Sequence, residues 1–389
     1  MLTKGNYFYR NVLFLSFFCS GFSLYTFFIP LLFLLCFLSL YKNKTLYLGT
    51  LATSLNILFI LLFVLFVFVI GVDRLVLEAP FKYAIYIVFM IVFLSLLLVN
   101  NMEYADKALL FFALGIFFRA EAVVIYSFLD PSGIYGYGKL LDPFNKQEIN
   151  SPGISNALAV VFVFLLVAFK ARTIIQTAFL IVIYPLLILS SVFLGGRAFF
   201  IIAIIGLFYQ FRKNLSLRTI IFSLLSGTII ISLVLILFKD VPIFDKYFNL
   251  ILERFGSEGL KSARFELIQD GIAKFTMHPM GGFIPYASDY SGEWYHNIYL
   301  DSARVAGILP VMMLVISNTI LLLSYLKCRK FNRNIKKPYF FLSAITLIIM
   351  CQDVVLEGNM MLLICYALFT TMQLQSGGNR NSESILQCK

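Results

Sequence analysis

The feature that most restricts the fold of this chain is a series of apolar runs, each about long enough to cross a ~30 Å hydrocarbon core. Only 13% of the 389 residues are charged and 60% are hydrophobic, a composition unlike that of soluble globular proteins. We therefore predict an all-α, polytopic integral membrane protein with about 12 transmembrane helices. The runs lie near residues 11–25, 27–41, 50–71, 83–100, 108–128, 153–169, 174–194, 198–211, 219–238, 297–325, 338–356 and 360–374.

The basic residues predict the orientation of these helices. An even number of crossings puts both termini on one side, and the loops on that side hold most of the Lys and Arg, six of them within 327–337 alone. The positive-inside rule therefore places both termini in the cytoplasm. This topology explains the net charge of +11, so we expect no nucleic-acid partner. The short loops on the other side carry only Arg74, Lys82, Lys139, Lys146 and Arg197.

The same topology divides the chain and leaves one long loop on the outer face. In that loop "IFDKYFNLILERFG" and "SARFELIQDGIAKF" show helical periodicity. In the second stretch Phe265, Ile268, Ile272 and Phe275 line one face, which predicts amphipathic helices near the membrane surface. The predicted parts are helices 1–9 over 1–238, the loop over 239–295, helices 10–12 over 296–374 and a cytoplasmic tail over 375–389.

Charged residues within or at the ends of apolar runs are costly to bury, so each is a candidate functional residue. Arg119 and Glu121 fall near the middle of one run, where the alternative is a structural pair between helices. Arg197 follows two glycines at an outer turn, where an arginine can also simply extend its head group to water. Asp353 and Glu357 end another run, where they either cap the turn or accept hydroxyls from a substrate.

His296 stands where the long loop enters the 297–325 run. An unperturbed imidazole titrates near ~6.5, which suits a general base, although a histidine at a helix start more often caps it. Asp301 and Arg304 are three residues apart and can pair. The second histidine, His278, precedes a Pro–Gly–Gly turn and is interpreted as structural.

Three stretches between about 190 and 310 share their order and spacing with a known family. "HNIYLDSARVAG" has His and Asn, then nine residues and Gly; "ARFELIQDGIAKFTMHPMGG" has an Arg, a helix and a His–Pro turn; "GGRAFF" joins an Arg to small residues. In these motifs the sequence resembles the bacterial O-antigen ligases and Wzy-type O-antigen polymerases. One departure is Gly196, where many ligases have Ser or Thr. The matching positions are Arg197, Arg264, His278, Pro279, Gly281, His296, Asn297 and Gly307.

The resemblance implies a membrane glycosyltransferase that uses a glycan linked to undecaprenyl diphosphate. His296 would then be the general base, and Arg197 and Arg264 would stabilise the leaving diphosphate through bidentate contacts, with Arg119 as a weaker third. Such chemistry needs no cofactor, and we see no residues with metal-ligand spacing. Asn297, Tyr299, Trp294 and Asp353 are the candidate substrate-binding residues, although aromatics at this depth also form ordinary interfacial belts.

The resemblance leaves the acceptor open. A polymerase of lipopolysaccharide biosynthesis, which we favour, joins two lipid-linked repeat units, so donor and acceptor are both undecaprenyl-diphosphate-linked oligosaccharides. An O-antigen ligase instead transfers the glycan to lipid A core. A transporter or flippase of the same lipid is a third alternative, but it would need polar residues in both halves of the chain. The expected location is the bacterial inner membrane with the active site facing the periplasm, and the other candidate partners are membrane lipid and a chain-length regulator protein.

Overall fold

The structure, a computed structural model, describes most of the predicted helices. The predicted run at 219–238, the first amphipathic stretch and nearly all of the run at 27–41 and of the tail lie outside the described residues. The described residues are 4–23, 34–35, 37–38, 47, 49–75, 79–129, 140–144, 148–149, 151–170, 173–212, 264–288, 292–331 and 337–376.

Each predicted run that the structure describes is helical, although the run at 338–356 is interrupted at 351–354. One short antiparallel pair, β1 (Leu140–Leu141) with β2 (Glu148–Ile149), follows α5. The helices are α1 (Lys4–Gly21), α3 (Leu51–Leu65, extended by the turns Phe66–Ile70 and Val72–Arg74), α4 (Pro80–Asn100), α5 (Ala105–Leu129), α6 (Ser151–Val167), α7 (Ile174–Phe193), α8 (Arg197–Phe211), α11 (Arg264–Met277), α12 (Ile298–Ala306), α13 (Ile308–Phe331), α14 (Lys337–Met350), α15 (Val355–Gly358) and α16 (Met360–Ser376).

The composition of these helices confirms a membrane-embedded, helical protein. Within the described ranges, five helical segments are long and apolar enough to cross a membrane. They are Leu51–Ile70, Pro80–Asn100, Ala105–Ser127, Ile174–Ser191 and Ile308–Lys327. Shorter apolar helices at Ser151–Val167, Arg197–Phe211, Pro338–Met350 and Met360–Gln375 complete the bundle. Twelve crossings therefore remain a prediction.

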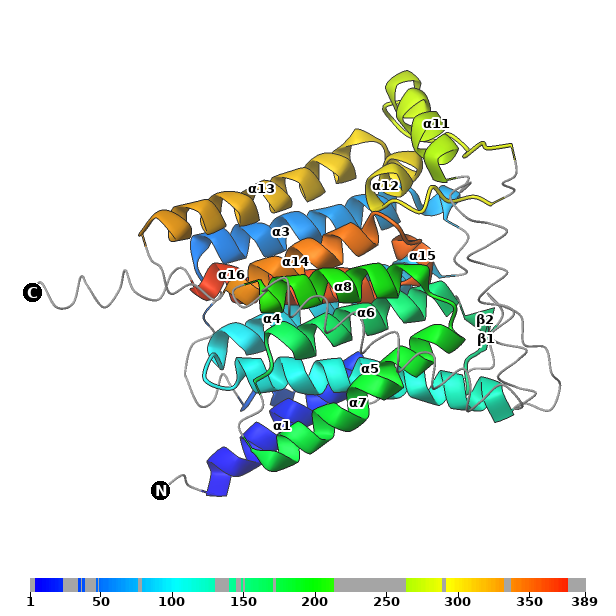
Figure 1. Cartoon of the computed structure of the whole chain (residues 1–389). Helices are drawn as coiled ribbons and strands as arrows, with labels where there is room; N and C mark the ends of the chain where they lie inside the picture. The colour runs from blue at the N-terminus through cyan, green and yellow to red at the C-terminus, as the bar shows by residue number, and fades with distance from the viewer. Residues whose placement is uncertain are drawn as a thin grey trace, which may run out of the picture.

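The helices lie side by side in one bundle, and only α11 stands outside it (Figure 1). α11 and the short α12 lie at one end of the molecule, which we call the α12 end. α1 begins and α16 ends at the opposite end (Figure 1). Polar side chains join helices inside the bundle: Asn56 donates to the carbonyl and hydroxyl oxygens of Ser317, each at 3.0 Å. Such interhelical hydrogen bonds satisfy polar groups where there is no water.

The predicted helix at 297–325 is broken in two at Gly307. Gly307 has φ 74°, in the left-handed region, and a Cβ there would lie 2.5 Å from the Pro279 carbonyl oxygen. The Ile308 N–H donates to that same oxygen at 2.9 Å. Only glycine permits both the backbone conformation and the close approach. The His–Pro turn and the glycine that ends "HNIYLDSARVAG" are therefore in direct contact, although 28 positions separate Pro279 from Gly307.

The predicted amphipathic helix at the end of the long loop is confirmed as α11, and only part of its apolar face, Ile268 and Phe275, packs against the protein. Leu267 and Gly271 are buried, whereas Phe265 is 71% exposed and Ile272 55% exposed. The reason is tertiary: α11 packs on the segment before α12, where a Cβ at Gly271 would meet the Tyr295 ring. A glycine can thus mark a buried contact that a pattern of large apolar residues does not reveal.

Candidate functional site

His296 lies immediately before α12 in an unusual backbone conformation. Its φ is 55°, in the left-handed region that non-glycine residues seldom adopt. The next residue, Asn297, is the N-cap of α12, and its side-chain oxygen accepts the N–H groups of Tyr299 at 3.0 Å and Leu300 at 3.4 Å. His296 is therefore outside the helix, and the cap that follows it fixes where the helix begins. A left-handed residue next to an N-cap points its side chain in a direction that a helical residue could not.

Asp301 holds this conformation from inside the protein. Its side chain is fully buried, and its two carboxylate oxygens accept the N–H of Tyr295 at 2.6 Å and the N–H of Asn297 at 3.0 Å. The backbone N–H groups of the two residues on either side of His296 are thus bound to one carboxylate. Burial raises the pKa of Asp301 to about 7, although both N–H donors favour the charged form. The positive charge of Arg304 also acts on this carboxylate, and a direct pair between the two side chains stays a prediction.

Asp301 should therefore be a positioning residue that acts through His296. We expect Asp301→Asn to lower kcat by about 10- to 100-fold, because the amide retains one acceptor and turns a donor toward the other N–H. KM should change little, since Asp301 is buried away from substrate. The measurement is kcat and KM for Asp301→Asn, His296→Gln and the double variant. The double variant should be no slower than His296→Gln alone, and additive losses would mean that Asp301 does not act through the imidazole.

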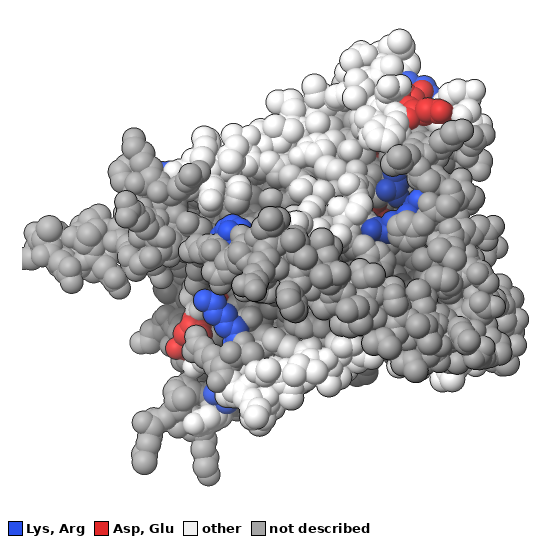
Figure 2. Space-filling model, in the orientation of Figure 1, with Lys and Arg blue, Asp and Glu red and all other residues white. Residues whose placement is uncertain are grey.

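Two arginines from distant parts of the chain meet near His296. Arg197 is the first residue of α8, after a turn in which Gly195 has φ 66° and Gly196 packs so closely on Ser155 of α6 that a Cβ would collide with it. Arg264, an exposed side chain, begins α11. The positive charge of Arg197 acts on Arg264, and that of Arg264 acts on His296. Basic side chains gather between α12 and the start of α8 (Figure 2).

A buried turn carrying Asp353 completes this group. Asp353 accepts the Val354 N–H at 2.9 Å and the Asn359 amide at 3.0 Å, and its negative charge acts on Arg264. The Asn359 amide also donates to the Gly153 carbonyl of α6 at 2.7 Å. These bonds favour the turn-capping alternative for Asp353, and substrate binding by it stays a prediction. We call His296, Arg197, Arg264 and Asp353 the His–Arg cluster.

The environment of His296 keeps its imidazole neutral. Burial, together with the nearby Arg264 guanidinium, lowers the pKa of His296 to about 4. Both causes disfavour the imidazolium form. The free protein therefore presents a neutral imidazole, able to accept a proton, at any pH well above 4. A bound anion between the arginines and the histidine would offset the positive charge and raise this pKa, which would strengthen the base when substrate is present.

The lowered pKa predicts where activity fails in acid. Because the proton-accepting form persists to about pH 4, protonation of His296 should cost kcat/KM almost nothing between pH 7.5 and pH 5.5, and a loss in that interval should come from protonation of Asp301, whose pKa is about 7. A histidine with an ordinary pKa of ~6.5 would itself lose about tenfold over that interval. Arg264→Gln should raise the pKa of His296 toward ~6.5, because it removes a positive charge. NMR titration of the imidazole C2–H tests this, with His278→Gln to assign the signals; a wild-type midpoint for His296 near ~6.5 would contradict it.

The other predicted residues lie in different settings. Arg119 forms an ion pair with Asp142 and lies over the Phe144 ring, with 4.6 Å from guanidinium carbon to ring centroid. This favours the structural alternative for Arg119. Glu121 likewise accepts the Ser190 hydroxyl at 2.6 Å between α5 and α7. A phosphate-binding role for Arg119 stays a prediction, and the contacts give it no support.

The predicted sugar-binding aromatics already contact other side chains of the protein. The Tyr299 hydroxyl accepts the Asn318 amide at 2.6 Å, and the Trp294 ring lies beneath the Arg304 guanidinium at 4.1 Å. Asn297 uses its oxygen for the cap, and its amide lies 3.5 Å from the Cys351 carbonyl. Substrate binding by these three stays a prediction. The role of Asp301 was missed, although an acidic residue four positions after the capping asparagine was a visible signal.

A scan against known protein-family models finds no match for this chain, and a search of characterised proteins finds none either. Its function is therefore argued from the motifs and from the geometry of the His–Arg cluster. Among the described residues, no group of three or more His, Cys, Asp or Glu side chains is placed to hold a metal ion.

Proposed function

We propose that this protein is a membrane glycosyltransferase that acts on a glycan linked to undecaprenyl diphosphate and polymerises O-antigen repeat units. The observation that carries this proposal is the His–Arg cluster. A neutral imidazole lies near the guanidinium of Arg264 from α11, which in turn lies near that of Arg197 from α8, at one end of a bundle of apolar helices. Such a group of side chains suits a reaction in which a hydroxyl loses a proton and a diphosphate leaves.

The reaction balances with the groups present. His296 takes the proton of the acceptor sugar hydroxyl as the oxygen attacks the anomeric carbon of the donor. The bond between that carbon and the diphosphate oxygen breaks, and the electron pair stays on the diphosphate. Arg197 and Arg264 stabilise the developing charge, which needs no metal when two guanidinium groups are held ready. The proton then passes from the imidazolium to solvent or to the departing diphosphate.

The setting of the cluster supports a reaction at the membrane boundary. The span that begins at Ile308 starts two residues after the end of α12, so His296 lies near the mouth of an apolar helix. A lipid-borne diphosphate in the bilayer and a hydrophilic sugar outside it would meet at that depth. We propose that this end faces the periplasm of the inner membrane, with both termini in the cytoplasm, as the Lys and Arg distribution predicts.

The lipopolysaccharide pattern of a deletion strain separates the alternatives. Loss of a polymerase should leave lipopolysaccharide with a single repeat unit. Loss of a ligase should leave undecorated core and an accumulation of lipid-linked polymer. Loss of a flippase should trap glycan on the cytoplasmic face. A normal ladder in the deletion strain would rule out all three. Re-expression of the full chain should restore the pattern.

A further inference from the structure

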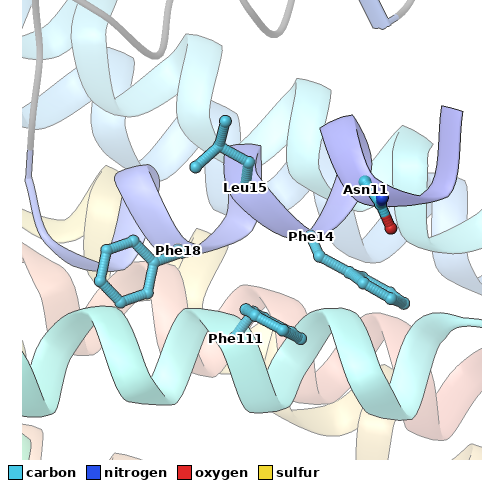
Figure 3. Close-up of a pocket in the computed structure, with 5 residues that line it drawn as sticks. All are labelled: Asn11, Phe14, Leu15, Phe18 and Phe111. Atoms are coloured by element: carbon cyan, nitrogen blue, oxygen red, sulfur yellow. The ribbon is translucent and has the colours of Figure 1, made fainter. Parts of the chain in front are cut away.

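A second polar cavity lies beside α12, apart from the His–Arg cluster. Its volume is about 380 Å³, and it is enclosed by the turn at 73–75, the segment 282–284, Glu293 and Arg304. By contrast, the cavity between α1 and α5 is lined by aromatic and aliphatic side chains and a single asparagine (Figure 3). The cavity at Arg304 is therefore the one with the chemistry to select a polar ligand. We call it the Arg304 cavity.

The side chain of Arg304 forms a buried, incompletely satisfied part of this cavity. Arg304 is only 6% exposed, its Nη2 donates to the Arg74 carbonyl at 3.3 Å, and its Nε has no hydrogen-bond partner. Buried donors in native proteins are nearly always paired, so an unpaired N–H on a side chain that lines a cavity indicates an acceptor that the protein itself does not supply. The guanidinium is also fixed in place by the Trp294 ring below it.

The charged residues that line the cavity are two carboxylates and two guanidinium groups, including Arg304. Arg74 is held by the carbonyls of Met280 at 3.2 Å and Val305 at 2.9 Å. Asp73 and Glu293 are exposed carboxylates on the rim. Two carboxylates offset two guanidinium groups, so this cavity has no excess charge to attract a diphosphate. Sugar hydroxyls both donate and accept, and they can therefore satisfy carboxylates and guanidinium N–H groups at once.

We propose that the Arg304 cavity binds a neutral sugar residue, a hexose or an N-acetylhexosamine, of the glycan that reacts at His296. The choice of a glycan as ligand rests on the proposed function. Arg304 lies eight residues after His296, or roughly 12 Å along a helical rise. At that distance the cavity would hold a sugar beyond the reacting one, and so would select the repeat unit without taking part in the chemistry.

The only tryptophan of the chain reports on this cavity. Because Trp294 lies under Arg304, a sugar that binds the guanidinium should change its emission. The test is a titration of the full chain in lipid nanodiscs with glucose, galactose, N-acetylglucosamine and N-acetylgalactosamine. We expect a saturable change with at least one of them. Glu293→Gln and Asp73→Asn should each raise the Kd about tenfold through loss of a charged acceptor. Glu266→Gln, an exposed carboxylate of α11 outside the cavity, is the matched control and should leave the Kd unchanged.

Each other outcome overturns the assignment. No saturable response to any of the four sugars, or equal Kd values in wild type and Glu293→Gln, would mean that sugar does not bind here. A Glu293-dependent response to inorganic pyrophosphate instead of sugars would make the cavity an anion site. Failure of the proposed function is distinguishable, because it is measured by the lipopolysaccharide ladder of His296→Gln. That variant should still bind sugar with the wild-type Kd.

Discussion

His296→Gln should abolish the polymerised lipopolysaccharide ladder in a complemented deletion strain and lower kcat by about 10²- to 10⁴-fold in the purified protein. Glutamine keeps hydrogen-bonding groups and roughly the size of the side chain but cannot accept the proton of the sugar hydroxyl at neutral pH. The effect should fall on kcat far more than on KM, because proton transfer belongs to the transition state and not to ground-state binding.

The chain provides its own control for this prediction. His278, its other histidine, is exposed, and its backbone N–H and carbonyl are bonded within the turn that precedes Gly281. His278→Gln should therefore keep the full ladder. Equal protein levels in the membrane fraction exclude a folding defect. A normal ladder from His296→Gln at wild-type protein level would remove the histidine from the mechanism and the central residue from the proposed site.

Arg197→Gln and Arg264→Gln should each lower kcat/KM by about 10²- to 10³-fold, the usual loss when one preorganised stabilising donor is removed. Lysine should restore little at either position, because an ammonium group cannot bind two phosphate oxygens in a planar fork. The two guanidinium groups repel each other in the free protein, and a bound diphosphate removes that repulsion. Loss of either arginine should therefore weaken diphosphate binding as well as slow the reaction.

A binding measurement separates this from a general loss of activity. Inorganic pyrophosphate should raise the Tm of the wild-type protein and should raise it much less in either variant. Arg212→Gln is the matched control, because Arg212 caps the other end of α8, 15 residues and roughly 22 Å from Arg197. If Arg197→Gln and Arg212→Gln respond alike to pyrophosphate, the arginines of the cluster do not hold the leaving group.

Much of the fold was predictable because it depends on local composition. Apolar runs of membrane-spanning length form helices wherever the chain places them, and every such run within the described residues is helical. The beginning of α12 was also a local matter, since Asn297 is a capping residue followed by helix-forming residues. The break at Gly307 could not be predicted from the local sequence, because it depends on the Pro279 carbonyl that packs against this glycine.

The candidate site was also predictable only in part: the sequence identified its residues, and the tertiary structure decided their partners. His296, Arg197 and Arg264 were identified from motifs, and the structure brings them together. Arg119 carries the same charge and lies within an apolar run, yet it pairs with Asp142. The charge of an arginine does not reveal its role, which depends on the partner that it meets across the bundle. Long-range pairing of this kind leaves no periodicity in the sequence.

The sequence by itself determined that this chain is a helical membrane protein and that a histidine and two arginines are its candidate reactive residues. The first conclusion rests on hydrophobic run length and the second on motifs that resemble those of a known family, and neither needs tertiary information. Only the tertiary structure decided how His296 is held. Asp301 accepts the N–H groups of the residues on either side of it, and burial together with the charge of Arg264 from another helix lowers its pKa. Hydrogen-bond partners and electric fields depend on distance in space, and the fold alone sets those distances.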